Sequence, residues 1–113
     1  MIVYKKAMLY DVRMERYRKV IVLMVVKEKL VVKTISRDKK MRARSVKVIS
    51  ITSLDGNKHF NECVSCGYGN ASRSTYTVGK ITHANGLDCS VLSACGKGIN
   101  FFKTRSEAKD YCP

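Results

Sequence analysis

The chain lacks, over most of its length, the residues that interrupt regular structure. Its one proline is Pro113, and all seven glycines fall between Gly56 and Gly98. Because proline and glycine are the strongest breakers of strands and helices, we expect residues 1–55 to form an unbroken series of strands. The second half of the chain should be richer in loops.

Long hydrophobic runs and a targeting segment are also missing. The longest apolar run is VIVLMVV, residues 20–26, which is far shorter than the ~20 residues of a membrane-spanning helix. RYRK precedes the run, but KEKLVVK follows it without a small-residue cleavage site. We therefore interpret residues 20–26 as a strand buried on both faces, in a cytoplasmic protein with no membrane partner.

Acidic side chains are scarce, and the shortage is uneven. The chain has 22 Lys and Arg against 9 Asp and Glu, a net charge of +13. Residues 1–48 carry 15 basic and 4 acidic side chains, whereas residues 49–113 carry 7 and 5. Such asymmetry indicates a face that meets an anion, such as nucleic acid, a nucleotide or an acidic protein. The alternative is a solvated surface without a ligand.

The pattern of the chain predicts one α+β domain over residues 1–113. Apolar residues make up 45% of the sequence, which is enough for a modest core. Alternating polarity in YDVRMER and β-branched residues in VKVISITSL are typical of strands, and Asp55-Gly56-Asn57 predicts a hairpin turn. We expect a mostly antiparallel twisted sheet with strands at residues 2–9, 10–16, 19–27, 30–36, 46–54, 58–64, 75–82 and 99–102.

A short helix should close the fold. Thr104 and Glu107 have the spacing of a capping box, in which the first side chain caps the helix and the second reaches back. The predicted helix covers residues 105–111, with Ala108 and Tyr111 facing inward. Phe101 or Phe102 should pack beneath it.

The basic segment RDKKMRAR, residues 37–44, is the first candidate for anion contacts. It is too polar for a core, so it forms either a loop or a strand with a charged face. In an extended chain Lys40, Arg42 and Arg44 would point to one side. Tyrosine rings at positions 4, 10 and 17 are candidates for base stacking. The predicted anion-binding residues are Arg37, Lys39, Lys40, Arg42, Arg44, Arg73 and Lys97.

Arg73 and Lys97 belong to that set because they lie in glycine-containing stretches, GYGNASRS and GKGIN. Neither stretch has the Walker A or dinucleotide-binding pattern. Short glycine loops can still present N–H groups to a phosphate, although ordinary turns explain them more simply.

The cysteines permit a metal site without requiring one. Cys63 and Cys66 have zinc-knuckle spacing, but Cys89 and Cys95 are separated by five residues. His59 or His83 could replace a ligand. Separate reduced thiols are the alternative, so we expect no cofactor and keep zinc on Cys63, Cys66, Cys89 and Cys95 as the minority hypothesis. A redox dithiol is disfavoured because Gly-Tyr-Gly-Asn follows Cys66.

Catalysis has little support in the sequence. There are two histidines, no suggestive pair of carboxylates and no nucleophile motif. His59 and Cys63 would face one side of an extended strand, but spacing alone establishes no general base. We expect that the protein is not an enzyme.

Three stretches resemble a known family: KMRARSVKVISITSLDG (40–56), YTVGKI (76–81) and CGKGINFFKTRSEAKDY (95–111). Together they are similar to a domain of unknown function scattered among bacteriophages and giant DNA viruses. That domain often lies beside pentapeptide repeats and ends in a Cys-x-x-Gly-Ile-His-Phe-Phe-x-Thr-Arg-Glu-Glu-Ala-like run. The best-matched positions are Arg42, Ala43, Val48, Gly79, Cys95, Gly98, Ile99, Phe101, Phe102, Arg105, Ala108 and Tyr111.

The resemblance implies a viral origin and a small α+β fold, but no activity. Met41 stands where that domain tends to have cysteine, and Asn100 where it tends to have histidine. The Cys63–Cys66 pair and Cys89 look particular to this chain, which makes zinc binding less expected as a property of the family.

We therefore expect a non-catalytic viral binding protein that captures an anionic small ligand, such as a host nucleotide signal, and so counters host defence. This step is an analogy with other small viral proteins. One alternative is a basic nucleic-acid-binding accessory protein. The other is an interaction module that inhibits a host enzyme. Exposed strand edges would also be compatible with a homo-oligomer.

Overall fold

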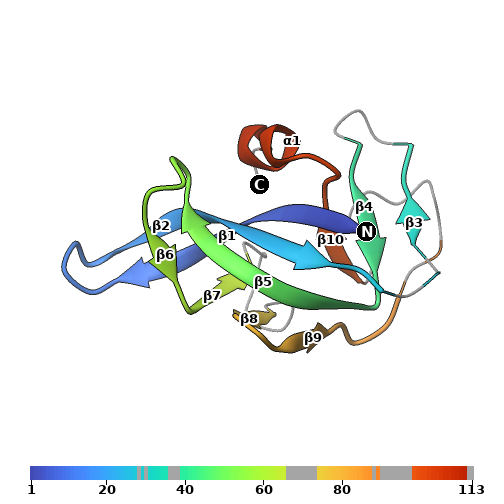
Figure 1. The fold of residues 1–113 in the computed structure, drawn as a ribbon, viewed down its shortest axis with the longest axis horizontal. Coiled ribbons are helices and arrows are strands. Elements are labelled where there is room, and N and C mark those ends of the chain that lie inside the picture. The colour runs from blue at the N-terminus through green and yellow to red at the C-terminus, as the bar shows by residue number, and fades with distance from the viewer. Residues whose placement is uncertain are drawn as a thin grey trace.

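Two antiparallel sheets and one C-terminal helix make up the described part of the chain, as the ribbon in Figure 1 shows. The computed structural model describes residues 1–27, 29, 31–35, 39–65, 74–87, 89 and 98–111. The predicted fold class, an α+β fold with a mostly antiparallel sheet and a short C-terminal helix, is confirmed.

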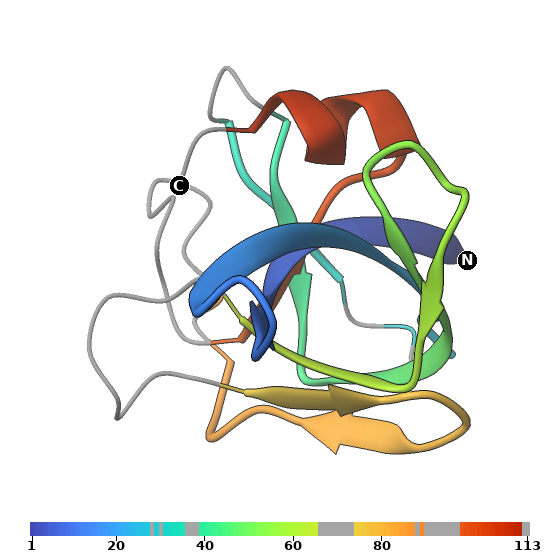
Figure 2. The ribbon, with the colours of Figure 1, turned by 90° about the vertical axis from the view of Figure 1, so that its left-hand side faces the viewer.

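The larger sheet follows the order β6-β5-β2-β1-β7-β8, with β9 also paired to β5. It curls until β8 and β9 lie side by side, where the Thr82 hydroxyl donates to the carbonyl of Thr75 (Figure 2). The smaller sheet has the order β10-β4-β3. The strands are β1 Ile2–Asp11, β2 Arg16–Val25, β3 Val32–Lys33, β4 Met41–Ala43, β5 Ser45–Ser53, β6 His59–Phe60, β7 Glu62–Ser65, β8 Thr75–Thr77, β9 Ile81–His83 and β10 Ile99–Phe101.

The two longest strands form one hairpin, and this corrects a prediction. β1 pairs with β2 from Ile2↔Val25 to Asp11↔Arg16, and residues 12–15 are the connecting turn. The prediction of a separate half-buried strand at residues 10–16 is therefore wrong. Its apolar members are exposed, and Glu15 adopts a φ of 50° that no strand contains.

The apolar run at residues 20–26 behaves as predicted. Val20, Ile21 and Val22 are consecutive and all buried, so both faces of β2 are covered. Even-numbered residues of this strand face the interior of the curled sheet, and Ile21 packs on the other side against α1, Arg105–Asp110. A register shift between Leu23 and Met24 interrupts the pairing of β2 with β5, and such bulges increase strand twist.

The remaining strand predictions are confirmed in part. Residues 45–53 form β5, and the turn at Asp55-Gly56 follows it, with φ of 81° at Gly56. Residues 58–64 do not form one returning strand: β6 pairs with β5, whereas β7 pairs with β1 and β8. Residues 75–82 do not form one strand: a turn at Gly79, whose φ is 85°, separates β8, which pairs with β7, from β9, which pairs with β5. Residues 30–36 contribute only the two residues of β3 among those described.

The C-terminal helix is capped as its sequence predicts. The Thr104 hydroxyl accepts a hydrogen bond from the Glu107 N–H at 3.2 Å and donates to the Glu107 carboxylate at 2.7 Å. Ala108 is fully buried, and Tyr111 packs on the same cluster. The Phe102 and Tyr111 ring centroids lie 5.2 Å apart, and Phe101 is part of the main core. The predicted packing role of these residues is confirmed.

The main core fills the inside of the curled sheet, and the smaller sheet closes one side of it. Met41 and Ala43 from β4, and Ile99 and Phe101 from β10, join the buried side chains of β1, β2 and β5. Residues 40–43 are all buried. The interpretation of the basic segment as too polar for a core is therefore wrong for these four residues.

Candidate anion-binding groove

The predicted anion contacts in the basic segment do not form one accessible surface. Arg42 is fully buried and Lys40 is 5% exposed, whereas Lys39 and Arg44 are exposed. The Gly98 backbone lies against the Arg42 side chain, so closely that a Cβ on Gly98 would be 3.3 Å from Arg42 Cδ. The expectation that Lys40, Arg42 and Arg44 present a common face to an anion is corrected by this burial.

Lys40 has a structural role at the C-terminal helix. Its Nζ donates a hydrogen bond of 2.7 Å to the Tyr111 hydroxyl and lies 4.4 Å from the centroid of the same ring. Lys6 supports the same end of the helix by donating to the carbonyls of Lys109 and Tyr111 at 2.9 and 3.0 Å. Cations near helix C-termini satisfy the last carbonyls and the helix dipole. Part of the basic excess therefore stabilises the fold.

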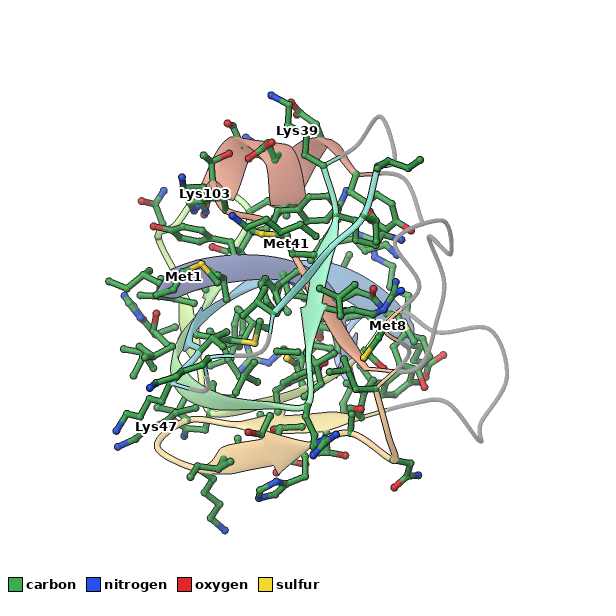
Figure 3. All side chains as sticks on the ribbon, turned by 90° about the vertical axis from the view of Figure 1, so that its right-hand side faces the viewer. Met1, Met8, Lys39, Met41, Lys47 and Lys103 are labelled. Carbon is green, nitrogen blue, oxygen red and sulfur yellow. The ribbon has the colours of Figure 1, made fainter. Side chains whose placement is uncertain are left out.

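The other predicted cations are dispersed or lie outside the described residues. Lys39 lies toward the helix end of the molecule in Figure 3, near Lys103, which was not among the predicted contacts. Lys47, also not predicted, lies toward the β8–β9 end. Arg37, Arg73 and Lys97 lie outside the residues that the structure describes, so their predicted role stays a prediction.

A groove opens instead between the end of the β1–β2 hairpin and the β5–β6 turn. Its volume is about 950 Å³, and it is open to solvent. Five cationic side chains and two carboxylates line it, together with Tyr10 and Phe60. The lining residues that carry charge are Arg13, Arg16, Arg18, Lys19, Lys58, Asp11 and Asp55.

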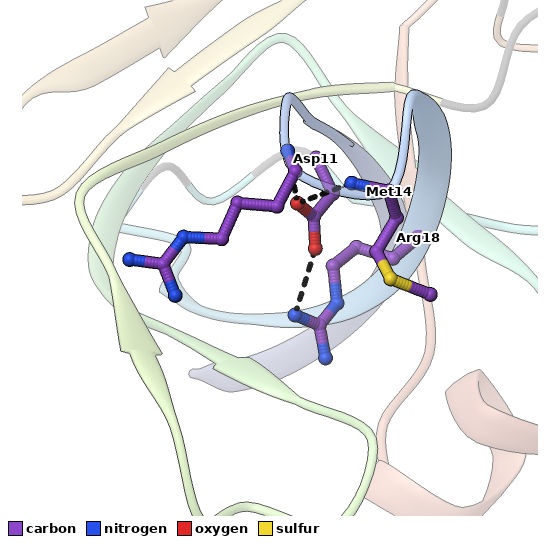
Figure 4. A network of polar contacts seen from close by, with 4 residues as sticks. Asp11, Met14 and Arg18 are labelled. Carbon is purple, nitrogen blue, oxygen red and sulfur yellow. Dashed lines mark hydrogen bonds and ion pairs between the residues drawn. The ribbon is translucent and has the colours of Figure 1, made fainter.

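Asp11 organises the hairpin side of this groove, as Figure 4 shows. Its Oδ1 accepts hydrogen bonds from the N–H groups of Arg13 at 3.0 Å and Met14 at 3.3 Å, and its Oδ2 pairs with Arg18 at 3.3 Å. An aspartate that bonds to the backbone two residues on is a common way to start a turn. The same carboxylate thus shapes the turn and orients one arginine.

Asp55 organises the opposite wall. Ser53 Oγ donates to its Oδ1, and so does the N–H of Asn57 at 2.9 Å. These hydrogen bonds, that from Ser53 first, hold the pKa of Asp55 below its ordinary value because they favour the charged form. Arg105 fixes this wall to α1, because its guanidinium donates to the carbonyls of Ser53 at 3.2 Å and Leu54 at 2.8 Å.

Three cations around the groove are available to an anion. Arg13, Arg16 and Lys58 are exposed, and within the described part of the chain their side chains have no hydrogen-bond or ion-pair partner. Arg18 is more constrained, because its guanidinium carbon lies 5.6 Å from the centroid of the Phe60 ring while it pairs with Asp11. The groove can therefore offer three unpaired positive charges without breaking an existing contact.

Aromatic rings lie next to these charges. Tyr10 and Tyr17 are opposite each other in the β1–β2 register, with ring centroids 5.3 Å apart at an interplanar angle of 68°. Both are about half exposed, at 49% and 51%. Two of the three tyrosines predicted for base stacking are thus neighbours, with Tyr10 in the groove lining and Tyr17 beside it, whereas Tyr4 packs beneath α1.

Sequence reasoning missed most of the groove because it treated residues 10–16 as a strand. RYRK, residues 16–19, supplies three of the cations at the groove and was a signal in the sequence. Lys58 comes from another part of the chain, and only the pairing of β2 with β5 and of β5 with β6 brings it there.

The cysteines do not assemble a metal site in the described part of the chain. Cys63 is buried on β7 and Cys89 is exposed. Within the described ranges, no three His, Cys, Asp or Glu residues come together as a metal-binding group. Cys66 and Cys95 lie outside those ranges, so the four-thiolate hypothesis stays untested.

The comparisons with known proteins give a family and no activity. In the part of the chain that the structure describes, no helix is long and apolar enough to cross a membrane. No curated protein and no solved structure matches the chain. Residues 1–108 match a family of unknown function, DUF5758, over both sheets and most of α1. The chain therefore belongs to the family of unknown function DUF5758.

Proposed function

We propose that this protein is a non-catalytic binder of a nucleotide ligand, which it holds in the groove between the β1–β2 hairpin and the β5–β6 turn. The single observation that carries the proposal is the combination of three unpaired cations with an exposed aromatic ring, Tyr10, around one opening. A nucleotide has the complementary parts, because its phosphates are anionic and its base has a flat face.

The phosphate would lie between the hairpin and the β5–β6 turn. Arg13 and Arg16 come from the hairpin and Lys58 from the opposite wall, so an anion between them meets positive charge from two sides. Guanidinium groups bind phosphate oxygens in a bidentate manner, and lysine acts as a point charge. The carboxylates of Asp11 and Asp55 repel a bound phosphate less than free carboxylates would, because each already accepts the hydrogen bonds described above.

The openness of the groove limits how much of a ligand it can bury. Its volume of about 950 Å³ falls near the top of the roughly 300–1,000 Å³ typical of ligand sites. An open groove of this size accommodates a nucleotide but buries less of it than a closed pocket does. We therefore expect affinities in the micromolar range rather than tighter ones.

The biological setting belongs to the same proposal. A viral origin, which the resemblance in the C-terminal half implies, would place the protein in the cytoplasm of a host cell. There, capture of a host nucleotide signal would lower its free concentration and so weaken a defence response. Binding alone is sufficient for this effect, and no catalytic group is needed.

A thermal-shift panel of linear and cyclic nucleotides tests the proposal. A ligand that binds only the folded state stabilises it by mass action and so raises the melting temperature. At a ligand concentration 100 times the dissociation constant, the free energy of unfolding rises by about 2.7 kcal/mol. We expect a shift with at least one nucleotide, and we expect Arg13→Ala and Tyr10→Ala each to reduce it. Lys33→Ala is the matched control, because Lys33 is an exposed lysine on β3 outside the groove. No shift with any nucleotide at millimolar concentration would overturn the proposal.

A further inference from the structure

We infer that the groove also binds single-stranded nucleic acid, of which at least two consecutive bases stack on Tyr10 and Tyr17. This inference rests on the proposed function and names the substrate class of the same groove. It favours a polymer over a free mononucleotide because the aromatic surface continues beyond the groove.

The two rings lie side by side on the outer face of the hairpin, next to the groove. Tyr10 lines the groove, and Tyr17 lies beside it on the neighbouring strand, outside the lining. Alternation along β2 puts Tyr17 and Lys19 on one face and Arg16 and Arg18 on the other. Ile21, on the same face as Tyr17, packs against α1, so this is the outer face of the curled sheet.

The geometry of the pair suits two bases better than one. The rings meet edge to face, at 68°, with centroids 5.3 Å apart. Each is about half exposed, so part of each ring stays open to solvent beside the edge-to-face contact. Both rings lie on the outer face because they are directly opposite in the register. One base would stack on Tyr10 at the border of the groove, and the next on Tyr17 farther from it.

Positive charge follows the same path. Arg13, Arg16 and Lys58 surround the groove, and Lys19 continues the cations on the face that carries Tyr17. Proteins that bind single strands combine a basic track for the backbone with aromatic platforms for successive bases. A duplex would not use these rings, because its base faces are covered by their neighbours in the stack.

Fluorescence anisotropy with labelled oligonucleotides tests the inference. The probes are thymidine monophosphate as competitor, single strands (dT)2, (dT)4 and (dT)8, and an eight-base-pair duplex, all at one salt concentration. We expect (dT)8 to bind at least about tenfold more tightly than the mononucleotide and more tightly than the duplex.

Variants of the two rings separate their roles. Tyr10→Ala should weaken the mononucleotide and the oligonucleotide together. Tyr17→Leu, which keeps apolar bulk but loses the ring, should weaken (dT)8 by about tenfold and leave the mononucleotide within about twofold. Tyr17→Phe keeps the ring and should retain tight binding. Ile81→Leu is the matched control, because Ile81 is 56% exposed on β9, outside the groove.

The outcomes distinguish this inference from the proposed function. If the mononucleotide binds as tightly as (dT)8, or if Tyr17→Leu has no selective effect, the inference is overturned while the proposed function stands. If the duplex binds as tightly as the single strand, the inference is likewise overturned. If neither nucleotide nor oligonucleotide binds, both fail.

Discussion

Lys40 and Tyr111, 71 residues apart in the chain, meet through a hydrogen bond of 2.7 Å between the ammonium group and the hydroxyl. The ammonium also lies over the ring, 4.4 Å from its centroid. Lys40 precedes β4 and Tyr111 ends α1, so the contact joins the smaller sheet to the helix. A lysine that the sequence suggested for anion binding therefore helps to hold the C-terminal helix in place.

Removing the tyrosine hydroxyl should destabilise this junction. Tyr111→Phe keeps the ring and its packing on Phe102, but takes a hydrogen-bond acceptor from a 95% buried lysine. We expect a loss of about 1–2 kcal/mol, which lowers the melting temperature by about 4–8 °C in a domain of this size. Differential scanning calorimetry measures it. An unchanged melting temperature would show that the hydroxyl contributes nothing to the junction.

The carboxylate of Asp11 has two roles that two substitutions can separate. Asp11→Asn keeps an oxygen for the N–H groups of Arg13 and Met14 but loses the ion pair with Arg18, which is 34% exposed. Such exposed pairs contribute about 0–1 kcal/mol. Asp11→Ala also removes the turn bonds and should cost about 1 kcal/mol more. Urea unfolding measures both, and equal losses for the two variants would contradict the assignment of the turn to this side chain.

Two glycines with positive φ differ in their surroundings and should respond differently to alanine. A Cβ on Gly98 would lie 3.0 Å from Leu87 Cδ1 and 3.3 Å from Arg42 Cδ, whereas a Cβ on Gly79 would have nothing within 4 Å. Gly79→Ala should cost about 1 kcal/mol from backbone strain alone. Gly98→Ala should cost about 3 kcal/mol because crowding adds to strain. Chemical denaturation of the two variants compares them, and an equal cost would contradict the close packing at Gly98.

The depressed pKa of Asp55 predicts a pH-dependent contribution to stability. Because the folded-state pKa of Asp55 lies below its ordinary value of 3.8, the charged form stabilises the fold above about pH 4, and this contribution is lost as the pH falls through the folded-state pKa. Asp55→Asn should therefore be less stable than the wild type at pH 6, with a gap that closes toward pH 3. Urea unfolding at both pH values measures the gap, and a gap as large at pH 3 as at pH 6 would contradict this origin.

The secondary structure elements that depend mainly on residues close in sequence were predicted from local sequence patterns. The buried run at 20–26, the β-branched strand before Asp55-Gly56 and the cap formed by Thr104 all have short-range causes, and the structure contains each of them. The turn at residues 12–15 has no glycine or proline, and its alternating polarity is that of a strand. Only Asp11, through its bonds to Arg13 and Met14, marks the reversal.

The candidate site was less predictable because the curled sheet assembles it. Tyr10 and Tyr17 could be named as stacking candidates, but their proximity follows from a hairpin that the pattern did not indicate. Lys58 joins them through two further strand pairings. The burial of Arg42 was not predictable either, because contacts from distant parts of the chain determine it. Its neighbours in β4, Met41 and Ala43, enter the core, and Arg42 itself is fully buried.

The most direct test of the groove compares two charge-reversed proteins of identical net charge. One carries Arg13→Glu, Arg16→Glu and Lys58→Glu at the groove. The other carries Lys33→Glu, Lys80→Glu and Lys103→Glu, which are exposed positions outside it. Because both sets change the net charge equally, long-range attraction of an anion is weakened to a similar extent in the two.

The measurement is the dissociation constant of ATP and of (dT)8 for each protein at about 150 mM salt, where long-range effects are screened. Nucleotide binding in the groove predicts a loss of at least about tenfold for the groove variant and a much smaller loss for the control. Equal losses in the two proteins would contradict a nucleotide site between the β1–β2 hairpin and the β5–β6 turn.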